Sequence, residues 1–159
     1  MMNNEYESID LSYLRTISDG SEDIIKELIE IFIEQIPEFT EGIQEHFQKK
    51  EWIALAGLAH KAKSSVISMG MSELGEVDLK NLELIAKNRR IKELNENGSG
   101  DDSANEEIER LVQNLEGYPE EKQNWVHEND QDETFKKIID KFVATCDNAI
   151  KELNSILEN

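Results

Sequence analysis

Between Glu22 and Gln48, apolar side chains recur at steps of three and four residues, and no other feature of the sequence constrains the fold as strongly. A helix with 3.6 residues per turn gathers such side chains on one face, so a long amphipathic helix is predicted here. Ser21 is expected to cap this helix, and Pro37 to kink it without ending it, because the stripe continues in phase beyond the proline. The stripe consists of Ile25, Leu28, Ile29, Phe32, Ile36, Phe39, Ile43 and Phe47.

Three more segments carry an apolar stripe at helical spacing. They predict helices from about Glu51 to Ser68, from Met71 or Ser72 to about Leu94, and from about Asp132 to Leu157. The stripe of the first segment is Trp52, Leu55, Ala59, Ala62, Val66 and Met69. The stripe of the second is less regular, with Leu74, Val77, Leu82 and Ile85 and with Asp78 and Asn81 near the same face. The stripe of the third is Phe135, Ile138, Phe142, Cys146, Ile150, Leu153 and Leu157.

Four long amphipathic helices joined mostly by short turns predict an all-α fold, arranged as an antiparallel up-and-down four-helix bundle. A short N-terminal helix, capped by Asp10 and running to about Ser18, is expected to precede them. Its inward side chains are predicted to be Leu11, Leu14 and Ile17.

We interpret residues 1–159 as a single domain, because the length suits one hydrophobic core. Residues 95–131 are predicted to be an insertion before the last helix. It begins with a flexible linker, rich in Asn, Gly, Ser and Asp, and continues with a short helix from Glu106 to Glu116. Trp125 and Val126 follow in a polar stretch and are expected to dock on the bundle.

Seventeen basic and 35 acidic residues give the chain a formal net charge of −18. Such a surface repels nucleic-acid phosphates and anionic membranes, so neither is expected as a partner. No apolar run of about 18 residues and no signal peptide is visible, which predicts a cytoplasmic protein. Cys146, the single cysteine, is expected to be buried on its apolar stripe. No metal-ligand spacing and no phosphate-binding loop is found, so neither a metal nor a cofactor is predicted.

The helix predicted over residues 51–68 places His60 roughly 130° from the centre of its apolar face, which points the imidazole outward. Ile53 and Ile67 lie two turns before and after it, and both are expected to be exposed. Small residues lie one turn away, namely Ala56, Gly57 and Ser64. A partner helix therefore has an apolar ridge to contact and free access to the ring.

The chemistry that suits this surface is phosphoryl transfer. A neutral imidazole has an available lone pair near pH 7 and attacks phosphorus without a separate base. Lys63, three residues after His60, is placed to reach the oxygens of an added phosphoryl group as a point charge.

Residues 59–74 resemble the signature of histidine phosphotransfer (HPt) domains. In that signature the histidine is followed by a hydrophobe two residues on, a lysine three on, usually a glycine four on, a small residue five on and a glycine ten on, with a leucine four residues after that glycine. The corresponding residues here are His60, Ala62, Lys63, Ser64, Ser65, Gly70 and Leu74. The resemblance extends from about Asp10 to Ile85 and resumes in the last helix, and it departs from the family where Ser64 replaces the usual glycine.

The resemblance implies that His60 accepts a phosphoryl group from the aspartate of a response-regulator receiver domain and relays it to another receiver. It also implies that Lys63 is the electrostatic partner, and that the receiver supplies the magnesium ion. The partners would be receiver domains or a hybrid histidine kinase, and the chain would be a monomeric relay intermediate rather than an enzyme. We predict that the docking surface consists of Ser64, Gly57, Ala56, Ile53 and Ile67.

Two alternative functions remain open at this point. One is a helical interaction module that has kept the bundle and lost transfer, since Ser64 leaves less room beside His60 than a glycine would. The same hydroxyl could instead hydrogen-bond the phosphoryl group. The other is the detached phosphoacceptor domain of a histidine kinase system. For residues 95–131, a partner-specific contact is one hypothesis.

Overall fold

The computed structural model of the chain describes residues 6–97 and 101–158, and all regular structure within these residues is helical. The prediction of an all-α fold is confirmed. The elements in chain order are α1 (Ser12–Ile17), α2 (Glu22–Gln48), α3 (Trp52–Ser68), the π-helix η1 (Leu74–Leu79), α4 (Lys80–Glu96), α5 (Asp102–Glu116), α6 (Glu120–Glu128) and α7 (Asp132–Glu158).

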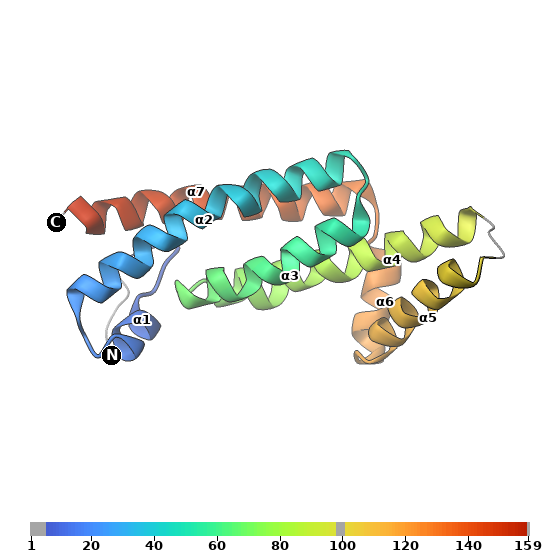
Figure 1. Cartoon of the computed structure of the whole chain (residues 1–159), viewed down its shortest axis with the longest axis horizontal. Helices are drawn as coiled ribbons and strands as arrows, with labels where there is room; N and C mark the ends of the chain where they lie inside the picture. Colours follow the sequence, from blue (N-terminus) through green and yellow to red (C-terminus); the bar gives the residue numbers. More distant parts are fainter. Residues whose placement is uncertain (1–5, 98–100, 159) are drawn as a thin grey trace.

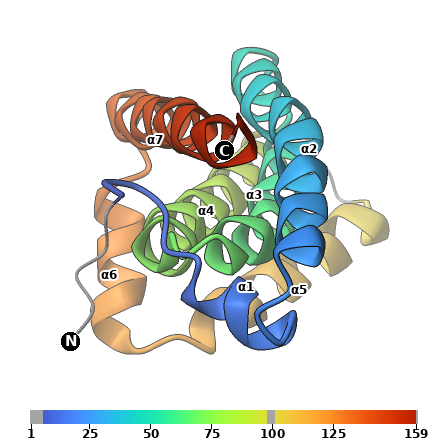
Figure 2. The same ribbon diagram turned by 90° about the vertical axis from the view of Figure 1, so that its left-hand side faces the viewer.

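Helix α3 packs against α2 on one side and against η1 and α4 on the other. Helix α7 runs beside α2 and also contacts η1 and α4, as the end-on view in Figure 2 shows. Helices α5 and α6 pack on α4 and on each other at one end of the molecule (Figure 1). None of the helices in the described ranges combines the length and the apolar character needed to cross a bilayer.

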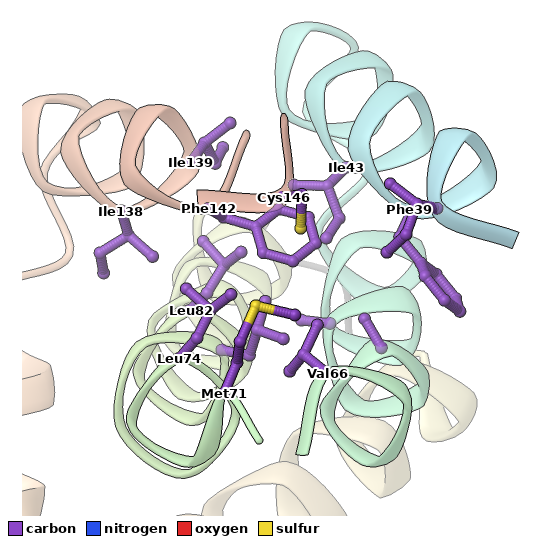
Figure 3. Close-up of a cluster of buried hydrophobic side chains, with 14 of the residues drawn as sticks. Phe39, Ile43, Val66, Met71, Leu74, Leu82, Ile138, Ile139, Phe142 and Cys146 are labelled. Carbon is purple, nitrogen blue, oxygen red and sulfur yellow. The ribbon is translucent and has the colours of Figure 1, made fainter. Parts of the chain in front are cut away.

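The predicted apolar stripes form the hydrophobic core. Figure 3 shows how side chains from α2, α3, η1, α4 and α7 meet there, among them Phe39, Val66, Leu74, Leu82 and Phe142. All six stripe residues of α3 are buried. Burying a side chain of this size contributes about 1.5–3 kcal/mol, so the stripes are a sufficient reason for the helices to associate.

The predicted boundaries of α2 are confirmed. The Ser21 hydroxyl accepts a hydrogen bond from the Ile24 N–H (3.4 Å), as expected of an N-cap. Pro37 lies inside a continuous helix, so it does not end α2.

The turn after α3 requires a glycine. Gly70 has a φ of +86°, and a Cβ atom there would lie 2.4 Å from the backbone oxygen of Asp10. The Asp10 N–H also donates to the Met69 carbonyl (2.9 Å), which ties the N-terminal segment to the end of α3.

The π-helix η1 was not predicted, and it explains the irregular register of the segment after α3. A π turn takes one residue more than an α turn, so Leu74 and Leu79 are both buried although five residues apart. Val77, expected on the inward face, is 45 % exposed, and that prediction is wrong.

The two polar residues of the irregular stripe, Asp78 and Asn81, have partners on other helices. Oδ2 of Asp78 lies 2.8 Å from Nζ of Lys141, as an ion pair whose angles do not fit a hydrogen bond. Asn81 accepts a hydrogen bond from Lys122 (2.7 Å).

Two further expectations are corrected at the surface and in the segment 95–131. Ile17 ends a helix of only six residues and is 53 % exposed, so it does not face the core. A second helix, α6, forms where only the docking of Trp125 and Val126 was expected, and it buries Val126 completely. The predicted short helix is present as α5, which begins four residues earlier than expected because the Asp101 side chain caps it by accepting the Ser103 N–H (3.0 Å).

Candidate functional site

The imidazole of His60 projects into solvent from the middle of α3. Its side chain is 66 % exposed, whereas Ala59 and Ala62 on either side of it are buried. The helical phase of α3 predicted this placement, because the buried stripe fixes which way the remaining side chains point.

One edge of the ring is held by a carboxylate that the sequence analysis did not identify. Nδ1 of His60 lies 3.0 Å from Oε1 of Glu83 on α4. The Glu83 side chain is only 5 % exposed, so the exposed imidazole rests on a buried anion. The other carboxylate oxygen accepts a hydrogen bond from Lys87 (2.9 Å), and the ammonium of Lys80 lies 3.9 Å from Oε1.

The charge on Glu83 decides which nitrogen of His60 carries the proton. Burial opposes ionisation of this carboxyl, but hydrogen bonds from Lys87 and His60 outweigh it, and the pKa of Glu83 is lowered. An ionised carboxylate only accepts hydrogen bonds, so Nδ1 of His60 must be the donor. In the neutral ring, Nε2 then keeps its lone pair. It lies on the part of the ring that Glu83 does not cover.

Lysines surround this pair. Burial and the neighbouring charge of Lys80 lower the pKa of Lys63. Burial also disfavours the charged form of Lys80, but a hydrogen bond to Tyr118 and the charge of Glu83 outweigh it and raise the pKa of Lys80. Lys80 and Lys87 thus form ion pairs with this carboxylate, and Lys63 adds a third positive charge close enough to interact with Lys80 and Glu83. The net charge of the chain, in contrast, is strongly negative.

A groove of about 660 Å³ opens beside His60, between α3 and α4 on one side and α5 on the other. We call it the His60 groove. Its lining combines apolar, cationic and acidic side chains, contributed by Ile53, Ala56, Gly57, His60, Glu83, Lys87, Glu107, Arg110, Leu111 and Asn114.

Of the five residues predicted to form a docking surface, three line this groove. Ile53 is 43 % exposed, Ala56 is buried beneath it, and a Cβ atom at Gly57 would meet no other atom within 4 Å. The surface around His60 is therefore open on the side of α5.

The other two predicted docking residues lie in a second hollow, of about 550 Å³, toward the end of α3. Ser64 is exposed, and its hydroxyl donates to the Lys61 carbonyl (3.4 Å). Ile67 was expected to be exposed but is half-buried, because its side chain lies over Gly75 of η1.

Sequence reasoning missed Glu83, Lys87 and the contribution of α5. One feature of the sequence pointed to Glu83: it is a lone carboxylate inside the apolar run Leu82–Ala86, where an unpaired charge is costly. For Lys87 and α5 the sequence offered no comparable feature.

Comparison of the chain with protein-family models, with curated proteins and with solved structures finds no match.

Proposed function

We propose that this chain is a histidine phosphotransfer protein, in which His60 accepts a phosphoryl group from the aspartyl phosphate of a response-regulator receiver domain and relays it to another receiver. The observation that carries the proposal is the exposed imidazole whose Nδ1 is held by the buried carboxylate of Glu83. This arrangement orients the ring and leaves Nε2 as the nucleophile.

The proposal includes the arrangement of the helices. We infer that α2, α3, α7 and the continuous segment of η1 and α4 form an antiparallel up-and-down bundle, with α5 and α6 as an addition to it. The contacts of α3 with α2 and α4, and of α7 with α2 and α4, support this arrangement. His60 then lies on the outer face of the bundle, where a receiver has access to it.

The transfer step balances without a further reactant. The lone pair on Nε2 attacks the phosphorus, the N–P bond forms, and the bond from phosphorus to the receiver's aspartate oxygen breaks. The electron pair of that bond returns to the aspartate as a carboxylate. The phosphorylated ring keeps its proton on Nδ1 and gains positive charge, which the ionised Glu83 stabilises at 3.0 Å.

The lysines assist in two ways. Lys63, one turn along α3 from His60, supplies a positive charge for the phosphoryl oxygens. Lys87 holds Glu83 in its ionised form through the 2.9 Å hydrogen bond. Both act as positioning charges. The leaving group and the metal ion belong to the receiver, so the chain acts as a relay intermediate rather than as an enzyme.

The test is phosphoryl transfer from purified receiver domains carrying labelled phosphate. We expect the wild-type chain to acquire label as an acid-labile, base-stable adduct, and His60→Gln to acquire none. His46→Gln is the matched control, because His46 is also a surface histidine with Nδ1 3.0 Å from a glutamate oxygen. Equal labelling of the wild type and His60→Gln, or no labelling of the wild type by any receiver, would overturn the proposal.

A further inference from the structure

Helix α5 is fixed in place beside the His60 groove. Arg90 of α4 binds Glu107 of α5 through two hydrogen bonds, of 2.7 and 2.9 Å. Lys87 donates to the side chain of Asn114 (2.9 Å), and Leu115 is buried in the core. The hydrogen bonds of Arg90 with Glu107 and of Lys87 with Asn114, together with the burial of Leu115, therefore hold α5 in a fixed position beside the groove.

One face of α5 lines the groove. Glu107, Arg110, Leu111 and Asn114 are spaced by three, one and three residues, which places them on the same side of the helix. Glu107 and Asn114 already accept hydrogen bonds from Arg90 and Lys87 of α4. Arg110 is exposed, and Leu111 is half-buried. Arg90 and, more weakly, the charge of Arg110 lower the pKa of Glu107, but among the described residues no carboxylate lies within salt-bridge distance of Arg110. A guanidinium and an apolar side chain are thus left for a partner.

The opposite side of the groove also exposes an apolar side chain. Ile53 of α3 exposes 43 % of its surface there, above the buried Ala56. Two apolar side chains, Ile53 of α3 and Leu111 of α5, therefore line the His60 groove together with His60. A groove with apolar side chains on both sides suits the apolar face of a third helix.

The charge of Arg110 indicates which charge the partner helix carries. On a chain with a formal net charge of −18, an unpaired guanidinium beside apolar surface is complementary to an acidic side chain. Burying it against a neutral partner would cost free energy, because a buried charge needs an ion pair or hydrogen bonds.

We propose that α5 forms one side of the receiver-docking site, and that Arg110 and Leu111 of α5, with Ile53 of α3, contact an amphipathic helix of the receiver that carries an acidic side chain. This inference rests on the proposed function. The groove leaves the imidazole of His60 66 % exposed, so a helix seated beside α5 does not need to displace α5 to bring the receiver's phosphoryl group to Nε2. Receivers without such a helix are poor donors.

The experiment measures transfer rate against receiver concentration, using the purified receiver domain that labels the wild-type chain fastest. Arg110→Glu is expected to raise the half-saturating receiver concentration about tenfold or more, because a like-charge contact replaces an attractive one. The rate at saturation should change by less than about twofold, since Arg110 does not touch the reacting atoms. Lys151→Glu is the matched control, because it also replaces an exposed positive charge by a negative one. Lys151 belongs to the last turns of α7, and the C-terminal end of α7 lies at the opposite end of the molecule from α5 (Figure 1).

Each outcome has a distinct meaning. If no receiver labels the wild-type chain, the proposed function fails and the docking site with it. If the wild type is labelled and Arg110→Glu behaves like Lys151→Glu, only the role of α5 is overturned. The role of α5 in docking is also overturned if Arg110→Glu or Arg90→Ala accelerates phosphoryl transfer, because that result would mean that α5 obstructs the receiver. Recovery of Arg110→Glu by an acidic-to-arginine substitution in the receiver helix would establish the contact.

Discussion

Within residues 6–97 and 101–158, two histidine–glutamate pairs have the same nitrogen–oxygen distance and different surroundings. In both pairs, Nδ1 of the histidine lies 3.0 Å from Oε1 of the glutamate, for His60 with Glu83 and for His46 with Glu51. The glutamate side chain is 5 % exposed in the first pair and 48 % exposed in the second. Glu83 also accepts a hydrogen bond from Lys87. A distance alone therefore does not distinguish the two sites.

The two pairs differ in how far the carboxylate is buried. Water screens the His46–Glu51 pair, and exposed pairs of this kind contribute about 0–1 kcal/mol to the free energy of unfolding. Glu83 has little water around it, so its charge must be satisfied by the protein, and it is satisfied by His60 and Lys87. The consequence is that the Glu83 carboxylate depends on His60 and Lys87, whereas water can also hydrogen-bond the Glu51 carboxylate.

The largest expected difference is in transfer. Glu83→Gln keeps the volume of the side chain and removes its charge. The amide can donate as well as accept, so it no longer fixes the proton on Nδ1, and no anion stabilises the positive charge of the phosphorylated ring. We expect the rate of transfer to His60 to fall about ten- to a hundredfold, the range seen when an imidazole that binds a metal loses its orienting partner. Glu51→Gln should leave the rate unchanged. Equal rates for the two variants, measured with the same labelled receiver, would remove the distinction between the pairs.

The next difference is in stability. At pH 7, Glu83→Gln should lower the free energy of unfolding by about 1.5–3 kcal/mol, because the hydrogen bonds from Lys87 and His60 lose their ionised, buried acceptor. Glu51→Gln should change it by less than about 0.5 kcal/mol. Urea unfolding of both variants gives the comparison, and the prediction fails if the exposed pair is the costlier one to break.

This stability difference should depend on pH in one direction. Burial opposes the ionisation of Glu83, yet hydrogen bonds from Lys87 and His60 lower its pKa below the ordinary value of 4.5. The ionised carboxylate therefore stabilises the folded state above pH 4.5, and the contribution is lost as the pH falls through the lower, folded-state pKa. The difference between the wild type and Glu83→Gln should shrink over that acid range in urea unfolding at successive pH values. A difference that grows on acidification would show the opposite sign of the shift.

The helices themselves were predictable because their periodicity is local. The stripe of α3 fixed both its buried face and the outward direction of His60. The exposure of Val77 was not predictable in the same way, because η1 is a π-helix and does not follow the α-helical period. The close contact of η1 with α3 is also not visible in the sequence pattern: a Cβ atom at Gly75 would lie 2.6 Å from the Ile67 side chain. A helical projection at 100° per residue does not take contacts between different helices into account.

The same π turn hid the partner of His60. One extra residue in η1 rotates every later side chain by about 100° relative to a regular helix. A helical projection from Leu74 therefore misplaces Glu83, which lies 23 residues from His60 in the sequence. The nucleophile was identified within one helix, whereas its orienting carboxylate required the packing of α4 on α3. The position of α5 beside the groove likewise depends on contacts between residues far apart in the sequence, such as Lys87 and Asn114.

A smaller effect is expected from the lysine behind the buried carboxylate. Lys87→Met keeps the apolar stem and removes the ammonium that binds Glu83 and Asn114. We expect a loss of about 0.5–1.5 kcal/mol in the free energy of unfolding, mostly from the hydrogen bond to Glu83, because the hydrogen bond to Asn114 is exposed to water. Lys49→Met is the matched control, since Lys49 binds the exposed Glu45 at 2.7 Å and should give no measurable change by urea unfolding. Equal losses for the two variants would contradict the importance of burial.

The smallest effect is expected in the exposed pair itself, and it is best measured as a coupling. His46 lies in the last turn of α2 and Glu51 at the start of α3, so their contact spans only the turn between the two helices. A double-mutant cycle with His46→Gln and Glu51→Gln should give a coupling free energy below about 0.5 kcal/mol. Because both groups are in contact with water, raising the salt concentration to about 1 M, where the Debye length is about 3 Å, should remove most of it. The cycle of His60→Gln with Glu83→Gln should keep a larger coupling at the same salt concentration, since little water reaches the carboxylate. If salt abolishes both couplings alike, Glu83 is not shielded, and the fixed orientation of His60 loses its physical basis.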